Sequence, residues 1–389
     1  MKAYQLYYQH PTMKEFKARV LSCEARDGMY DIELEDTAFY PEGGGQPADS
    51  GYIGAARVTH VYETAGGVVH VCDKPLEVGM EYDASIDWNR RFDHMQHHTA
   101  EHLVSGIINK LYGADNVGFS IGEYYVTIDF NRELSHEEVE NIETLANEAV
   151  FKNLPVRVKY FDKTPEFSYR SKKELSGTIR IVIIDDYDTC ACAGTQLAST
   201  GEIGLIKIIS VQKYKTGSRI YLMCGFRALN DYRMKESNVA AISALISSKP
   251  DEVAVHVEKL YEEREALKFE LLSAKYALID MKTDKMQPAD KMLIFEDNLS
   301  NEEMKRYLVN LTEKISTIAV FSGDDTNGYR YMVTSSTVDV SDLAKAMNAE
   351  LSGKGGGKGT AGGYVQASRA QIEKFFEGSF FKGAVNEAD

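Results

Sequence analysis

A long run without glycine and almost without proline is the feature that most constrains how this chain can fold. Residues 227–285 contain a single proline, Pro250, in the break "SSKP". Beyond the break, apolar residues follow a heptad-like spacing that Arg264 interrupts. These positions are Val253, Val257, Leu260, Leu267, Leu271, Ala274 and Leu278. A helix of this length would reach roughly 50 Å. The spacing predicts a helical arm that either packs on its own domain or pairs with a second chain.

The segments on either side of the arm divide the chain into four predicted parts, with an α+β fold overall. Residues 1–90 hold short alternating runs such as "MYDIELED", separated by glycine-containing turns, which predict a small β-barrel. Residues 91–226 mix helical and strand patterns and predict an α+β domain. Residues 227–285 form the arm, and residues 286–389 predict a compact α/β unit. A length of 389 residues fits two or three domains.

Composition limits the expected location of the protein, the state of its cysteines and its binding partners. No basic start precedes an apolar run, and no apolar stretch is long enough to span a bilayer, so we expect a cytoplasmic protein without a membrane segment. Five cysteines in such a chain favour free thiols or metal ligands over disulfides. The net charge of -15 argues against a general nucleic-acid coat, but it leaves room for a local basic groove.

The stretch "HMQHHTAEHL" is the first candidate for a metal site. His94, His98 and His102 recur every fourth residue, so they would share one face of a helix, while His97 points elsewhere. His94 and His102 would lie roughly 12 Å apart along the helix, too far to bind one ion. Only two neighbouring histidines of this stripe can bind the same ion. The alternative is that the histidines bind no metal and are instead hydrogen-bonded within the protein or exposed to solvent.

A soft ligand for such a pair occurs in the loop sequence "DTCACAGTQLASTGEIG". Cys190 and Cys192 lie there between two strand patterns. Two helical histidines and one thiolate are a set that suits zinc. The sequence therefore predicts a metal site built from both segments.

The glycine-rich stretch "GKGGGKGTAGGY" near the C-terminus either links two parts flexibly or lets the backbone approach another group closely. Lys354 and Lys358 within it are available for phosphate. The stretch lacks the preceding strand and the glycine spacing of a Walker loop.

Three motifs together carry a family resemblance over nearly the whole chain. "TAFYPEGGGQPADSG" at 37–51, "HTAEH" at 98–102 and "CAGTQLASTGEIG" at 192–204 resemble the signatures of the alanyl-tRNA editing proteins called AlaX. The arm and the glycine-rich end resemble the C-terminal part of alanyl-tRNA synthetase, a DHH-associated domain. The chain is thus similar to a long form of AlaX.

The resemblance implies a zinc site with four protein positions. The family pattern, His-x-x-x-His followed by Cys-x-x-x-His, selects His98, His102 and Cys192 and leaves His94 and Cys190 outside the set. Its last position is Gln196 here, and an amide oxygen is a poorer zinc ligand than imidazole. Gln196 coordinates weakly, or water takes the fourth position, or the site stays empty; we expect an occupied but weaker site.

The resemblance also implies the reaction, which is hydrolysis of serine from mischarged Ser-tRNA(Ala), with Gly-tRNA(Ala) as a second substrate. Gly43, Gly44 and Gly45 would approach the terminal adenosine, with Gln46 beside the ester. Thr37 would bind the serine hydroxyl, which alanine lacks. Zinc fits either activation of water or anchoring of the amino group. We also expect a homodimer formed through the C-terminal half.

Two other functions are alternatives to editing. A complete alanyl-tRNA synthetase needs a charging domain of several hundred residues, for which residues before 37 leave no room. A tRNA-binding protein without catalysis, or a hydrolase of another aminoacyl ester with an altered metal site, remains the alternative. It would bind tRNA without hydrolysing Ser-tRNA(Ala).

Overall fold

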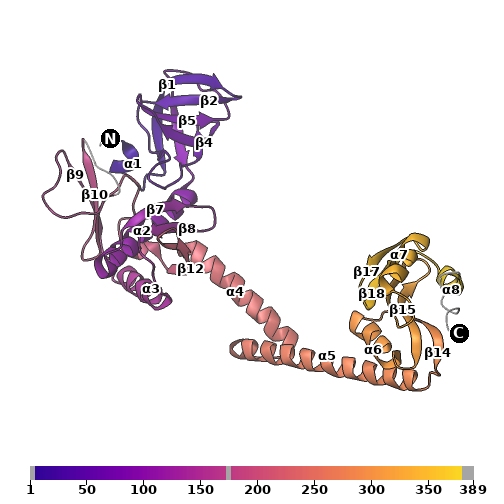
Figure 1. Ribbon diagram of the computed structural model, residues 1–389. Coiled ribbons are helices and arrows are strands. Elements are labelled where there is room, and N and C mark those ends of the chain that lie inside the picture. Colours follow the sequence, from indigo (N-terminus) through magenta and orange to yellow (C-terminus); the bar gives the residue numbers. More distant parts are fainter. Residues whose placement is uncertain (1–4, 172–176, 379–389) are drawn as a thin grey trace. The chain divides into compact units, whose positions relative to one another are not determined.

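The computed structural model describes residues 5–171 and 177–378 (Figure 1). Contacts divide the chain into two compact units, residues 1–241 and 242–389. Among the described residues, no helix combines the length and the apolar character that crossing a membrane requires. The mixed α+β class predicted from the sequence is confirmed.

The first unit begins with a closed six-stranded barrel, as the alternating runs predict. Its strands pair in the order β1-β2-β5-β4-β3-β6. Inward-facing side chains such as Val20, Ile32, Val58 and Val61 fill the interior, and each is almost fully buried. The elements are α1 (Leu6–Gln9), β1 (Glu15–Arg26), β2 (Met29–Leu34), β3 (Gly51–Ile53), β4 (Ala56–Glu63), β5 (Val68–Cys72) and β6 (Glu81–Ile86).

Helix α2 (Trp88–Tyr112) follows the barrel and is buried along most of its length. The Asp87 carboxylate accepts from the Arg90 N–H at its start, and Gly113 ends it with a left-handed φ of 65°. Two antiparallel sheets and helix α3 surround it. Because α2 lies at the centre of the core, its polar residues are forced into contact with their neighbours rather than with solvent.

The four-stranded sheet has the order β12-β13-β8-β7, and the three-stranded sheet has the order β11-β10-β9. Their strands are β7 (Asn116–Ile121), β8 (Val126–Phe130), β9 (Val156–Phe161), β10 (Ile179–Ile184), β11 (Asp188–Ala191), β12 (Ile206–Tyr214) and β13 (Gly217–Cys224). Helix α3 (His136–Phe151) opens with a capping box of Ser135 and Glu138. A short 3-10 helix, η1 (Thr200–Ile203), precedes β12.

The predicted arm, residues 227–285, lies mostly in two helices, α4 (Gly225–Ile246) and α5 (Val253–Asp284), with the 3-10 turn η2 (Pro250–Glu252) between them. The chain breaks at Ser247, which adopts a φ of 53°. The last turns of α5 pack on the following domain, where Arg306 binds Asp280. The heptad positions further up α5 are exposed: Leu260 is 49% exposed, Leu267 64% and Leu271 59%.

The last part is a five-stranded sheet with helices, in the order β14-β15-β16-β18-β17. Its elements are β14 (Ala289–Glu296), α6 (Asn301–Leu311), β15 (Ile315–Asp324), β16 (Gly328–Ser335), α7 (Val340–Glu350), β17 (Gly353–Gly356), β18 (Thr360–Val365) and α8 (Arg369–Glu377). The glycine-rich stretch forms the β17–β18 hairpin. A Cβ at Gly363 would lie 2.3 Å from the Lys354 carbonyl oxygen, so glycine at this position allows the backbones of β17 and β18 to lie close together.

Candidate metal centre

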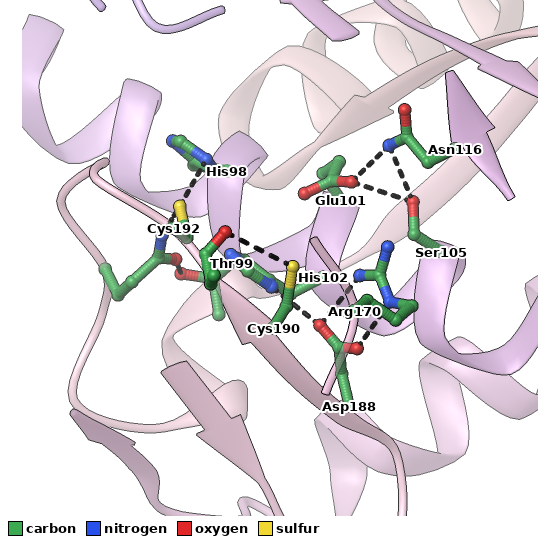
Figure 2. Close-up of polar contacts among 12 residues, drawn as sticks. His98, Thr99, Glu101, His102, Ser105, Asn116, Arg170, Asp188, Cys190 and Cys192 are labelled. Atoms are coloured by element: carbon green, nitrogen blue, oxygen red, sulfur yellow. Dashed lines mark hydrogen bonds and ion pairs between the residues drawn. The ribbon is translucent and has the colours of Figure 1, made fainter. Parts of the chain in front are cut away.

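Helix α2 carries the two predicted histidine ligands on adjacent turns. The rings of His98 and His102 are nearly parallel, with centroids 5.7 Å apart. The loop after β11 brings Cys192 to the same place, and one ring nitrogen of each histidine and the Cys192 sulfur all lie within 4.8 Å of one another (Figure 2). We call these three residues the metal cluster. Two imidazoles and a thiolate are a donor set that suits zinc.

Gln46 determines which nitrogen of His98 faces the cysteine. The Thr195 backbone N–H donates to Gln46 Oε1 at 3.2 Å, so this atom must be the amide oxygen. The same oxygen lies 2.8 Å from His98 Nδ1, which therefore carries the proton and donates it. Nε2 is then the nitrogen that faces the cysteine, 3.3 Å from Cys192 Sγ. His98 is thus oriented to bind a metal through Nε2.

Asp188 orients His102 in the same way. Its Oδ2 accepts from His102 Nδ1 at 2.7 Å, and Arg170 holds the carboxylate with bonds of 2.7 and 2.8 Å (Figure 2). Among the described residues, His102 Nε2 is buried without a hydrogen-bond partner. Metal-binding histidines commonly have one nitrogen held by a carboxylate and the other directed at the ion. The residues present therefore fit a metal.

The Cys192 side chain is prepared to act as a thiolate. Burial by itself would raise the pKa of this thiol, but the nearby His98 and His102 outweigh burial and hold the pKa well below its usual range. The Gly194 N–H donates to Sγ at 3.3 Å. A Cβ at Gly194 would lie 2.0 Å from His98 Cε1, so glycine is required for the loop to pass this ring.

Gln196 lies next to the sulfur, at the position where the family pattern has its last ligand. Its Nε2 is 3.6 Å from Cys192 Sγ, and its Oε1 accepts from the Thr99 hydroxyl at 3.0 Å. The structure brings Gln196 to the metal cluster with the amide nitrogen toward the sulfur. Coordination through its oxygen would require the amide to turn over.

The three predicted glycines form a tight turn that delivers Gln46. Gly43 and Gln46 exchange backbone hydrogen bonds of 3.0 and 3.1 Å, and Gly44 and Gly45 between them have φ of 61° and 85°. A Cβ at Gly45 would lie 2.4 Å from the Phe119 carbonyl oxygen of β7. Glycine at this position therefore allows the turn to reach α2 across β7.

Thr37 lies in the barrel, where His70 binds its hydroxyl. His70 Nδ1 donates to the Ile32 carbonyl at 3.0 Å, so Nε2, 2.8 Å from Thr37 Oγ1, accepts the hydroxyl proton. Burial lowers the pKa of His70 to about 4, which keeps the ring neutral. The hydroxyl oxygen also accepts from the Phe39 N–H. These contacts stay within the barrel and do not join Thr37 to the metal cluster.

Lys354 and Lys358 lie far along the chain, in the second unit, and both are exposed. Lys354 belongs to β17, and Lys358 lies in the turn before β18. The structure therefore gathers Gln46, His98, His102, Cys192 and Gln196 at one site, while the two lysines belong to another part of the molecule.

Several residues that support the metal cluster could not be recognised from the sequence. Asp188 and Arg170 support His102, whereas Thr195 and Thr99 fix the two glutamine amides. Their roles depend on contacts between distant segments. Cys190, which the family pattern leaves out, forms a second group of potential ligands with His102 and Asp188.

The other two histidines of α2 have different surroundings. His97 Nδ1 lies 2.7 Å from the Asp93 carbonyl and donates to it, and its Nε2 accepts from the Cys224 N–H at 3.0 Å. Because Cys224 belongs to β13, His97 has a structural role that joins α2 to β13. His94 is also buried, and burial lowers its pKa to about 3.

Three family models match separate parts of the chain. Residues 5–90 match the class II (A) tRNA synthetases, and residues 179–221 match the "Threonyl and Alanyl tRNA synthetase second additional domain". Residues 289–378 match the DHHA1 domain. The second match contains Cys192 and Gln196, and the third contains the glycine-rich hairpin.

Curated relatives extend the similarity to most of the chain. The alanyl-tRNA editing protein AlaX-L of Pyrococcus horikoshii is 29% identical over 95% of this chain and 96% of its own length. Alanyl-tRNA editing protein Aarsd1-B of Xenopus laevis is 33% identical over 61% of this chain and 60% of its own length. The alanine–tRNA ligase of Pyrococcus abyssi is 31% identical over 91% of this chain, which spans 41% of the ligase. The chain is thus similar, over nearly its whole length, to an alanyl-tRNA editing protein of the AlaX type, and it spans less than half the length of the alanine–tRNA ligases that it matches.

Proposed function

We propose that this protein is an aminoacyl-tRNA deacylase that removes serine, and secondarily glycine, from mischarged tRNA(Ala). The observation that carries the proposal is the hydrogen bond between Gln46 and His98. It joins the glycine turn of the first motif to the metal cluster formed by the other two. The similarity to AlaX-L, whose name describes alanyl-tRNA editing, supports this substrate class.

We further propose that the metal is zinc, one ion per chain, held by His98, His102 and Cys192. Gln46 and Asp188 hold Nδ1 of the two histidines, so Nε2 of each ring is the nitrogen that would coordinate the ion, which replaces any proton there. Zinc bound there would supply a Lewis acid for ester hydrolysis.

We propose that Gln46 acts on the substrate as well as on His98. Its oxygen accepts from Thr195 and His98, and its Nε2 donates to Thr195 Oγ1 at 2.9 Å. An amide nitrogen carries two N–H bonds, so one is left to donate to the ester carbonyl as negative charge develops on it. The backbone of Gly44 and Gly45 beside it allows the terminal adenosine to approach closely.

Thr37 would provide selectivity by accepting a hydrogen bond from the serine hydroxyl. Its own proton is donated to His70, and one of its oxygen lone pairs receives the Phe39 N–H. The remaining lone pair can only accept. Serine can donate to it and alanine cannot, so the correct product would bind less well.

The second half of the chain would bind a distant part of the tRNA and pair two chains. The exposed heptad positions of α5, including Leu260, Leu267 and Leu271, offer an apolar stripe for a second copy. Lys354 and Lys358 of the glycine-rich hairpin offer charge for phosphate. In this proposal the four parts are a barrel (1–90), an editing domain (91–226), an arm (227–285) and a tRNA-binding domain (286–389), working in the cytoplasm.

Deacylation of purified Ser-tRNA(Ala) beside Ala-tRNA(Ala) tests the proposal. The native protein should release serine much faster than alanine, and His102→Ala should release neither. A matched control is His136→Ala, because His136 lies exposed at the start of α3, away from the metal cluster. Binding of tRNA without release of serine would instead favour a non-catalytic tRNA-binding protein.

A further inference from the structure

We propose that Gln196 binds the Cys192 sulfur and not the metal, so that the chain supplies three ligands and leaves the fourth position open to a small donor. This inference rests on the metal site of the proposed function, but not on the identity of the substrate. It concerns the one residue at which this chain departs from the four-ligand pattern.

The direction of the hydrogen bonds around Gln196 follows from a backbone amide. The Leu197 N–H donates to Thr99 Oγ1 at 3.1 Å, since a backbone N–H can only donate. The Thr99 hydroxyl then sends its own proton to Gln196 Oε1, 3.0 Å away. The amide oxygen is thereby engaged, and Nε2 is the atom that faces Cys192 Sγ at 3.6 Å.

Turning the amide over would be costly at this site. Thr99 is fully buried and Gln196 is 3% exposed, so solvent cannot replace a lost partner. A turned amide would aim its N–H at the Thr99 oxygen, which already accepts from Leu197, and the Thr99 proton would lose its acceptor. A buried polar group without a partner is strongly disfavoured. The structure therefore favours the amide nitrogen at the sulfur.

An amide nitrogen in this position cannot coordinate a metal, because its lone pair is delocalised and its protons point at the sulfur. It instead donates to the thiolate beside the Gly194 N–H, which lies 3.3 Å from Sγ. Two N–H donors reduce the negative charge on a thiolate ligand and so adjust its bond to the ion. Gln196 is thus a positioning residue for Cys192.

Cys190 does not supply the missing fourth ligand. Its sulfur groups with His102 and Asp188, whereas the Cys192 sulfur groups with His98 and His102. Among the described residues these are two separate groups that share only His102. An ion at the metal cluster therefore keeps one position for an outside donor such as water, an amine nitrogen or a small anion, as zinc sites in enzymes do.

Cobalt(II) bound to the full-length protein, titrated with azide, tests this ligand set. The native protein should show a saturable change of its visible spectrum, because azide enters the open position. Gln196→His should bind cobalt more tightly and should not respond to azide, because imidazole fills that position. Gln196→Ala should keep the azide response and lose about tenfold in cobalt affinity, as when a partner outside the coordination shell is removed.

Thr99 provides a second test that does not depend on removing Gln196. Thr99→Val frees the amide to rotate, so the sulfur-to-cobalt charge-transfer band should shift in the direction seen for Gln196→Ala. Thr99→Ser keeps the hydroxyl and should keep the native band. Circular dichroism of each metal-free variant serves as a check on folding.

The opposite results would overturn the inference. A native cobalt protein that ignores azide, while Gln196→Ala gains a response and loses more than roughly 100-fold in affinity, would make Gln196 a ligand. A gain of azide response in Cys190→Ser alone would make Cys190 the fourth ligand. The deacylation assay decides the proposed function separately, because it measures release of serine and not the ligand set.

Discussion

Gln46 and His98, 52 positions apart in the chain, are joined by a 2.8 Å hydrogen bond in which the imidazole Nδ1 donates to the amide oxygen. The bond fixes the proton on Nδ1 of a candidate metal ligand from a tight glycine turn in another segment. In the proposed function, the remaining Gln46 N–H lies beside the ester. Substrate contact and metal geometry would then be coupled through one side chain.

Replacing Gln46 should weaken the metal site as well as the reaction. Gln46→Leu removes the acceptor for His98 Nδ1, so the ring loses its fixed tautomer, and zinc affinity should fall by about tenfold. Competition with a chromophoric chelator measures this change. Gln212→Leu, on the exposed part of β12, is the matched control and should keep native affinity. Equal affinities in the two variants would show that Gln46 does not orient the ligand.

Asp188→Asn should affect both metal binding and stability. The neutral amide is a weaker acceptor for His102 Nδ1, and it leaves the partly buried Arg170 without its ion pair. Zinc affinity should fall by about 10 to 100-fold, and the free energy of unfolding by about 3 kcal/mol or more. Isothermal titration and urea unfolding give the two values. Asp186→Asn nearby, at an exposed position, should change neither.

Thr37→Val should reduce discrimination between Ser-tRNA(Ala) and Ala-tRNA(Ala) by about tenfold, because one hydrogen bond of roughly 1.4 kcal/mol is lost. Thr37→Ser retains the hydroxyl and should retain most of the discrimination. The ratio of the two initial deacylation rates is the measurement. An unchanged ratio in Thr37→Val would leave Thr37 only its contact with His70 inside the barrel.

Stability of the first unit should decrease as the pH falls from 6.5 toward 4. Burial lowers the pKa of His70 from 6.5 to about 4 in the folded chain. As the pH falls through this range, His70 is protonated in the unfolded chain but not yet in the folded one, which favours unfolding. This contribution is fully present above pH 6.5, and it amounts to about 3 kcal/mol at 1.36 kcal/mol per pKa unit. Urea unfolding followed by the fluorescence of Trp88, the single tryptophan, reports on this unit.

His70→Gln removes the titrating group and should flatten this dependence on pH. His136→Gln, at the exposed start of α3, should leave the dependence as it is in the native protein. If His70→Gln and the native protein lose stability in parallel between pH 6.5 and 4, the loss arises from other groups.

The apolar stripe of α5 should hold two chains together. Leu267→Glu with Leu271→Glu places charge on two exposed heptad positions, and light scattering should then report a monomer. Release of serine at saturating Ser-tRNA(Ala) should stay near native, because the metal cluster lies in the other unit. Glu258→Lys, outside the stripe, should keep the dimer. A dimer in the double variant would place the interface elsewhere.

Patterns that repeat over short distances made the elements of this fold predictable. The alternation in "MYDIELED" and its neighbours indicated the barrel, and the i, i+4 spacing of the histidines in α2 indicated a chelating pair. A thiolate from the loop of Cys190 and Cys192 completes a common zinc donor set. The family resemblance then selected His98, His102 and Cys192 from these candidates.

The support of the cluster could not be predicted, because it depends on contacts between segments that only the folded chain brings together. Asp188 and Arg170 act on His102 from 86 and 68 positions away, and no spacing in the sequence pairs either of them with this histidine. The orientation of Gln196 depends on the hydroxyl of Thr99, to which the motif "HTAEH" assigns no role. Such roles follow from burial and from the direction of each hydrogen bond.

Zinc dependence of serine release from Ser-tRNA(Ala) tests the central claim most directly. Chelator-treated protein, freed of the chelator, should lose its deacylation rate and should recover it as zinc is added, with the recovery complete at one equivalent per chain. Cys192→Ala should recover no rate under the same titration. Full activity in metal-depleted protein, or recovery in Cys192→Ala equal to the native protein, would contradict a catalytic metal site formed by His98, His102 and Cys192.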